Sequence, residues 1–159
     1  SIPPVMKDYM ALMARNINRF IDTDILIQEE EGKLLKDIIA EKGIDGFLEI
    51  EDRINANVIA KHSVISPGGS VVYCSEAMEH LKSIGKVVYL RISLESLETR
   101  LGNLKKRGVL LKEGQTLKSL YEERIPLYEK YADIVVDEEG KDLEASLQAL
   151  LETLQTGVN

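Results

Sequence analysis

Short apolar runs alternate with amphipathic stretches along this chain of 159 residues. Runs rich in Val and Ile that end at polar residues predict buried strands, and apolar residues at helical spacing predict helices between them. This alternation is typical of a mostly parallel sheet covered by helices on both faces. We therefore expect an α/β fold of three layers in a single domain, residues 1–159, with four recognisable strands at Phe20–Asp24, Ser63–Ser66, Lys86–Ser93 and Ile134–Asp137.

Start and stop residues delimit the helices between these strands. Asp24, Ser75 and Ser93 each precede or open an amphipathic stretch, and we expect their side chains to accept hydrogen bonds from the first free amides. Glycines are expected to end several of the helices. The predicted helices are Ser1–Ile17 (after Pro3 and Pro4), Ile25–Glu31, Lys33–Lys42, Ile44–Lys61, Ser75–Ile84, Leu94–Leu101, Thr116–Tyr131 and Leu143–Leu154.

The stretch Phe20–Asp24 passes from apolar residues into two carboxylates, Asp22 and Asp24. Side chains alternate faces in an extended segment, so both acids would point the same way at the end of the strand. A strand that turns straight into a helix is how open α/β sheets present residues to a ligand. The alternative, which this stretch alone supports equally well, is that Asp24 only caps the helix and Asp22 is only solvated.

Glycine and acidic residues form two further clusters. Two glycines in Pro67-Gly68-Gly69, after a predicted buried strand, would let a ligand approach the backbone amides closely. A plain turn explains the pair equally well. The acids Glu49, Glu51 and Asp52 of the third predicted helix are interpreted as a solvated face.

Two basic clusters occur later in the chain. Gly102–Gln115 is polar and long for a plain connection, so we expect a lid, and it carries Arg107 with Lys105 and Lys106. The planar donors of arginine suit phosphate, although a solvated basic loop is the simpler interpretation. Arg124 stands two residues before Pro126, and a helix kinked at that proline would aim the side chain inward. Exposed helical arginines are nevertheless commoner.

Composition narrows the class of protein. A net charge of −7 disfavours binding of nucleic acid by the whole surface, although a basic pocket is compatible with it. The only cysteine, Cys74, excludes an internal disulfide and suits a reducing cytoplasm. No apolar run reaches the roughly 18 residues of a membrane span, and no signal peptide is recognisable. Because the sequence opens on Ser1 rather than Met, we expect that residues upstream have been removed.

The acid pair, glycine pair, basic loop and helix arginine follow one another in an order that resembles shikimate kinase. The resemblance extends from about Arg15 to Leu154. The stretch with arginine, proline, leucine and tyrosine is rather specific in combination with Asp-Thr-Asp, whereas the glycine pair is not. The matching stretches are Phe20-Ile-Asp-Thr-Asp24, Gly68-Gly69-Ser-Val-Val72, Val87-Val-Tyr-Leu90, Arg107 with its loop, and Glu123-Arg-Ile-Pro-Leu-Tyr-Glu-Lys-Tyr-Ala-Asp133.

The resemblance implies a fold similar to the P-loop nucleoside-monophosphate kinases and transfer of the ATP γ-phosphate to the 3-hydroxyl of shikimate. It implies that Asp24 holds and orients the attacking hydroxyl, while Asp22 lies near a Mg²⁺ ion. Backbone amides of Gly68 and Gly69 would contact the substrate, and Arg124 would pair with its carboxylate. We accordingly expect a cytoplasmic monomer of aromatic amino acid biosynthesis that acts on a small molecule, with no nucleic acid or membrane partner.

For the nucleotide, the resemblance implies three basic residues. Lys7 stands near the place of the phosphate lysine, and Arg100 matches a position that packs near the adenine. Arg107 would move in with the lid and stabilise charge on the transferred phosphoryl group.

Several departures from the family pattern leave alternatives open. No Gly-x-x-x-x-Gly-Lys-Ser/Thr motif or first strand is recognisable, and Ser1–Asp8 stands in its place with Pro3 and Pro4, which lack amide protons. Leu48 occupies the usual place of a carboxylate-binding arginine, and Pro67 replaces the first glycine of a Gly-Gly-Gly run. One alternative is a catalytically impaired or inactive relative that binds a small anionic ligand or a protein partner. Another is a kinase for a different small hydroxy acid.

Overall fold

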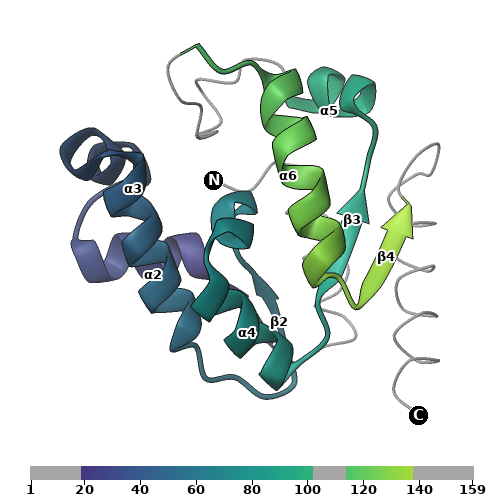
Figure 1. Cartoon of the computed structure of the whole chain (residues 1–159). Helices are drawn as coiled ribbons and strands as arrows, with labels where there is room; N and C mark the ends of the chain where they lie inside the picture. The colour runs from purple at the N-terminus through teal and green to yellow at the C-terminus, as the bar shows by residue number, and fades with distance from the viewer. Residues whose placement is uncertain (1–18, 102–113, 138–159) are drawn as a thin grey trace.

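The computed structural model describes residues 19–101 and 114–137 (Figure 1). Each predicted strand is present. The α/β class with parallel strands is confirmed. The strands are β1 (Arg19–Asp22), β2 (Ser63–Ser66), β3 (Val88–Arg91) and β4 (Ile134–Asp137). Two of the four, β2 and β4, have the predicted bounds, and the other two differ at their ends.

The strands pair in two separate parallel ladders within the described residues. β1 pairs with β2, and β3 pairs with β4. The sequence predicted one mostly parallel sheet, so the separation into two ladders differs from the prediction. In the first ladder Asp22 lies opposite Ser66, so the carboxyl ends of β1 and β2 meet at one edge.

Helices follow the strands much as the pattern predicts, and Thr116, which the sequence placed in the helix, is instead the N-cap of the last of them, α6. The helices are α2 (Thr23–Glu31), α3 (Leu35–Ala56), the 3₁₀ helix η1 (Gly69–Tyr73), α4 (Ser75–Ile84), α5 (Leu94–Leu101) and α6 (Leu117–Tyr131).

A single helix, α3, covers two of the predicted ones. Gly43 interrupts it with a φ of 73°, which explains why the sequence predicts a boundary there. The helix ends at Ala56 and not at Lys61, and Ile59 beyond its end is 88% exposed. The predicted helices Ser1–Ile17 and Leu143–Leu154, and most of the predicted lid Gly102–Gln115, lie outside the described residues.

The N-termini of two helices correct the sequence prediction. Asp22, not Asp24, caps α2, because its Oδ1 accepts a hydrogen bond from the backbone amide of Asp24 at 3.0 Å. β1 therefore ends at Asp22, and Asp24 belongs to the helix. Ser75 is the first residue of α4 and makes no cap. The amide of Ala77 instead donates to Oδ1 of Asp52, on α3, at 2.7 Å.

The predicted cap of α5 is confirmed. Ser93 Oγ accepts from the amide of Ser96 at 3.1 Å, which satisfies one of the amides left free at the start of the helix.

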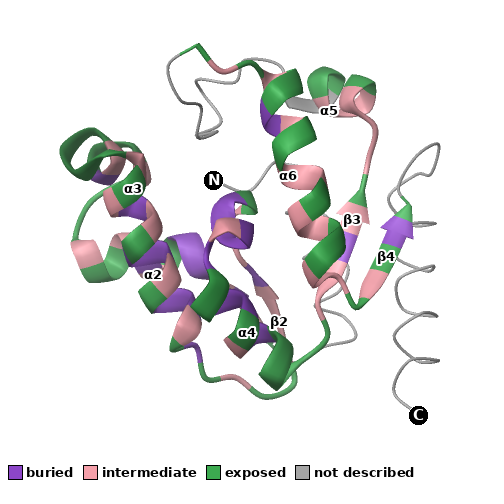
Figure 2. Cartoon of the chain, in the orientation of Figure 1, coloured by how far each residue is buried: buried purple, intermediate pink, exposed green. Residues whose placement is uncertain are grey.

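Two hydrophobic clusters hold these elements together (Figure 2). α3 and α4 lie side by side. One cluster joins η1 and α4 to the side of α6 that carries Leu127, Tyr128 and Tyr131. The other lies between α2 and α3, and its buried members are Ile27, Ile38, Phe47, Ile50 and Ile54.

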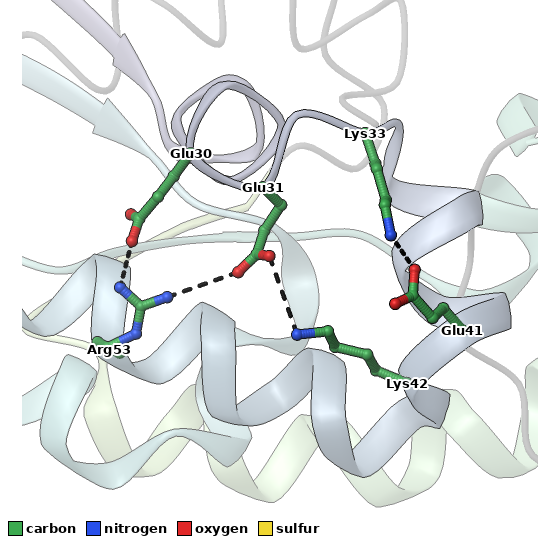
Figure 3. A network of polar contacts seen from close by, with 6 residues as sticks. All are labelled: Glu30, Glu31, Lys33, Glu41, Lys42 and Arg53. Atoms are coloured by element: carbon green, nitrogen blue, oxygen red, sulfur yellow. Dashed lines mark hydrogen bonds and ion pairs between the residues drawn. The ribbon is translucent and has the colours of Figure 1, made fainter.

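Ion pairs add a second link between α2 and α3 (Figure 3). Arg53 of α3 contacts Glu30 and, through Nη2 at 3.6 Å, Glu31, while Lys42 reaches Glu31 at 3.9 Å. Arg53 and Glu30 are about half exposed, and exposed pairs contribute roughly 0–1 kcal/mol each. The packing of these helices therefore rests mainly on the apolar cluster. None of the helices in the described ranges is long and apolar enough to cross a membrane.

Candidate functional site

The carboxyl ends of β1 and β2 place Asp24 beside the glycine pair. After the paired residues Asp22 and Ser66, one chain segment turns into α2 and the other continues from Pro67 to Gly69. A Cβ atom added to Gly68 would lie 3.1 Å from Asp24 Oδ1 and 3.2 Å from Glu51 Oε2. Two acidic side chains therefore approach the backbone of Gly68 from α2 and α3, in space that a side chain at this position would fill.

Arg124 approaches the next glycine from α6. A Cβ on Gly69 would lie 3.0 Å from Arg124 Nη1 and 3.0 Å from the hydroxyl of Tyr128. The Tyr128 hydroxyl also donates to the carbonyl oxygen of Gly69 at 3.0 Å. The structure thus brings together Asp24, the glycine pair and Arg124, four of the residues that the sequence singled out.

The position of α6 depends on aromatic contacts. The ring of Tyr128 stacks on Tyr89 of β3 with centroids 5.1 Å apart, and the Tyr121 hydroxyl donates to the carbonyl of Ile92 at 2.7 Å. The helix continues through Pro126 without a break. Arg124 therefore reaches Gly69 because the whole helix packs against η1.

Arg124 is held among aromatic and polar neighbours. Its guanidinium carbon lies 5.5 Å from the ring centre of Tyr73, a distance typical of a cation–π contact. The Tyr73 hydroxyl donates to Glu123 at 2.9 Å, and Gln115 donates to the same carboxylate at 2.9 Å. Arg124 Nε is buried and has no hydrogen-bond partner within the described residues.

Beside Arg124 the surface is hollowed, and one wall of the hollow is apolar. Ile44, Leu48 and Leu120 form this wall, with Tyr73 next to them. Leu48 also packs against the cluster under η1 and α4. Among the described residues that line the hollow, Arg124 therefore supplies the one guanidinium group.

Glu51 is the site residue that the sequence interpretation missed. It is fully buried, and its Oε1 accepts a hydrogen bond from Ser70 Oγ at 2.7 Å. Burial raises the pKa of Glu51 from 4.5 to about 7; the Ser70 hydrogen bond and the charge of Arg124 oppose the rise, and the Asp24 charge adds to it. Its spacing of four residues from Phe47 was the available signal, because that spacing puts both on one helix face.

The prediction of a solvated acidic face on α3 is therefore wrong for two of its three residues. Glu49 is exposed as expected, but Glu51 is buried and Asp52 is half-buried where it caps α4.

The two acids after β1 differ in their surroundings. Asp24 is 6% exposed, and burial raises its pKa above 3.8, with the charge of Asp22 adding to the effect. Asp22 is half-buried. Burial also raises the pKa of the Cys74 thiol, so this residue is no candidate nucleophile near neutral pH.

The residues predicted to bind the nucleotide are not part of this cluster as described. Lys7 and Arg107 lie outside the described residues, and Arg100 belongs to α5 at a position whose side chain is not described. Within ranges 19–101 and 114–137, no group of three or more His, Cys, Asp or Glu residues is arranged to hold a metal ion.

Comparison of the sequence with protein-family models shows to which family the chain belongs. The family model for shikimate kinase matches residues 11–155. The chain belongs to the shikimate kinase family. It is 38% identical to a shikimate kinase from Persephonella marina over 77% of this chain and 75% of the relative. It is 33% identical to one from Moorella thermoacetica over 91% of this chain and 84% of the relative.

Solved structures of shikimate kinases share the fold. One from Acinetobacter baumannii, in complex with shikimate, matches with a TM-score of 0.80 at 25% identity, over 97% of this chain and 86% of that chain. One from Aquifex aeolicus matches with a TM-score of 0.72 at 30% identity, over 94% and 89%. The predicted family and P-loop kinase fold are confirmed, and family membership assigns the chain to the ATP-dependent phosphotransferases.

Proposed function

We propose that the chain binds shikimate, or a closely similar carboxylated polyol, between Asp24 and Arg124 and transfers the ATP γ-phosphate to its 3-hydroxyl. The observation that carries this proposal is the convergence of the two residues on adjacent glycines. Asp24 meets the backbone at Gly68, and Arg124 meets it at Gly69. A ligand with a carboxylate at one end and hydroxyls at the other matches that arrangement of charges.

Each residue has a role that its chemistry supports. The guanidinium of Arg124 pairs with the ligand carboxylate through two parallel N–H donors. Asp24 accepts a hydrogen bond from the attacking hydroxyl and directs its oxygen toward the phosphate, which is the positioning that phosphoryl transfer requires. Because Gly68 and Gly69 carry no side chains, Asp24 and Arg124 can approach the backbone at these two positions.

The family implies ATP and Mg²⁺ as further participants. The residues of this chain fit Mg²⁺ better than they fit the nucleotide phosphates. Mg²⁺ is commonly bound by one or two carboxylates together with substrate phosphates and water, and Asp22 supplies such a carboxylate beside Asp24. We propose that Lys7, Arg100 and Arg107 bind the nucleotide. The sequence offers no glycine-rich phosphate loop beside them. When bound, Mg-ATP would supply the phosphoryl group and neutralise its charge.

The second candidate function is that of a relative without such a loop. A relative without an amide cradle loses much of the electrostatic positioning of the phosphates, and would bind a small anionic ligand without turnover. The apolar wall at Leu48 in turn favours a third candidate, a kinase for another small hydroxy acid. We also propose that the protein is a cytoplasmic monomer, and its single cysteine suits a reducing cytoplasm.

Release of ADP in the presence of shikimate and Mg-ATP tests the proposed function. We expect turnover by the full chain, its loss in Asp24→Asn, and its retention in Asp45→Asn, which changes an exposed acid of α3. Shikimate binding without ADP release would reject the kinase activity and favour the second candidate. Equal activity of Asp24→Asn and the unaltered chain would remove Asp24 from the chemistry.

A further inference from the structure

Glu51 is a buried acid without the partner that a buried charge requires. Its side chain is fully buried, Oε1 accepts from Ser70 Oγ at 2.7 Å, and Oε2 has no hydrogen-bond partner among the described residues. No lysine or arginine of the described ranges forms an ion pair with it. Buried carboxylates that lack a paired cation are more stable in the protonated form.

The groups that face Glu51 come from every element packed around it. Asp24 approaches from α2, because its Oδ1 and Glu51 Oε2 lie 3.1 Å and 3.2 Å from one point beside Gly68. Arg124 acts on it from α6, and Cys74, just before α4, lies 3.8 Å from Oε1 through its sulfur atom. Asp52, on the same helix as Glu51, faces Cys74. Acids thus outnumber the single guanidinium in this set.

We infer that Glu51 is a positioning residue of the proposed ligand site, which anchors the glycine turn through Ser70 as an uncharged acid and leaves the charge of Arg124 to the ligand. This inference rests on the proposed function insofar as the ligand is a carboxylate. Ser70 directly follows the glycine pair, so its bond to Oε1 fixes the backbone that carries Gly68 and Gly69. Glu51 itself is too buried to touch a ligand.

Loss of the proton from Glu51 would change the site without breaking the Ser70 bond. A charged Glu51 would attract the guanidinium of Arg124 and repel an anionic ligand held there, so affinity falls as the acid ionises. Burial raises the pKa of Glu51 to about 7, which places this change in the neutral range. In Glu51→Gln the Oε1 acceptor for Ser70 remains, and the side chain is neutral at every pH.

The test has a ligand arm and a ligand-free arm on the full chain. Calorimetric titration with shikimate from pH 6 to pH 8.5 should show a fall in affinity of about tenfold, and less than about twofold in Glu51→Gln. Ser70→Ala removes a hydrogen bond that lowers the pKa of Glu51. The fall in shikimate affinity of this variant should therefore occur at higher pH than in the unaltered chain. Glu49→Gln, an exposed acid on the same helix, is the control and should behave like the unaltered chain.

In the ligand-free arm, infrared spectra should show the stretching band of a protonated carboxyl at pH 6 that disappears by pH 8.5 and is missing from Glu51→Gln. The same fall in affinity in Glu51→Gln and in the unaltered chain would overturn the inference, because other titrating groups would then explain it. Absence of shikimate binding at every pH would overturn the proposed function, and the infrared arm alone would then decide the charge of Glu51.

Discussion

The substitution Glu51→Gln should make the stability of the protein much less dependent on pH. Glu51 is fully buried, and burial raises its pKa from 4.5 to about 7. The folded state therefore holds a proton that the unfolded chain releases between these two pH values, so the free energy of unfolding falls as the pH rises across this interval. Above about pH 7 the folded protein releases the proton as well, and the loss contributed by this group levels off.

The size of the effect follows from the same two pKa values. A rise from 4.5 to about 7, at about 1.4 kcal/mol for each pH unit, predicts a loss of about 3 kcal/mol between pH 4.5 and pH 8. The glutamine side chain of the Glu51→Gln variant would not ionise and would keep the acceptor for Ser70. For a protein of this length, 3 kcal/mol corresponds to a change in melting temperature of roughly 6–12 °C.

Urea denaturation of the two proteins at pH 5, 6, 7 and 8 measures the difference directly. We expect the free energy of unfolding of Glu51→Gln, relative to that of the unaltered chain, to rise by about 3 kcal/mol from pH 5 to pH 8. Glu49→Gln, exposed on the same helix, should follow the unaltered chain. A difference between Glu51→Gln and the unaltered chain that stays constant with pH would refute the argument, since it would show that Glu51 is already ionised at pH 5.

Three further substitutions test individual contacts. Asp52→Ala removes the acceptor for the amide of Ala77 and should lower the free energy of unfolding by about 1 kcal/mol in urea denaturation; an unchanged midpoint would show that water replaces the cap. Gly69→Ala places a methyl group 3.0 Å from Arg124 Nη1 and should weaken shikimate binding about tenfold by calorimetry, with unchanged affinity counting against a ligand at this glycine. Leu48→Arg adds a second guanidinium to the apolar wall and should raise shikimate affinity about tenfold relative to Leu48→Met, whereas weaker binding would favour a different hydroxy acid as substrate.

The elements that the sequence predicted correctly are those with strong local signals. All four strands were found from short apolar runs, and the bounds of α4 were predicted correctly although Ser75 does not cap it. The convergence of Asp24, the glycine pair and Arg124 was predicted from the resemblance to the family. The parallel register of β1 and β2 then explains physically why two of these positions meet.

What the sequence did not predict depends on contacts between distant segments. Glu51 was interpreted as solvated because acids usually are, and its burial results from Ser70 on η1, Asp24 on α2 and Arg124 on α6. Asp52 caps a helix that begins more than twenty residues later, which no local cap pattern could indicate. Partners of this kind become apparent only when the chain is folded.

The central claim is that Asp24, the glycine pair and Arg124 form one site for a carboxylated polyol. Calorimetric titration of shikimate into the full chain and into Arg124→Ala, without nucleotide, tests it most directly, with Lys130→Ala as a surface cation control on the same helix. The account predicts one shikimate per chain, unchanged affinity in the control, and at least about tenfold weaker binding in Arg124→Ala, since hydrogen bonds to charged groups are worth about 1.5–3 kcal/mol. Equal affinity of Arg124→Ala and the unaltered chain would contradict it.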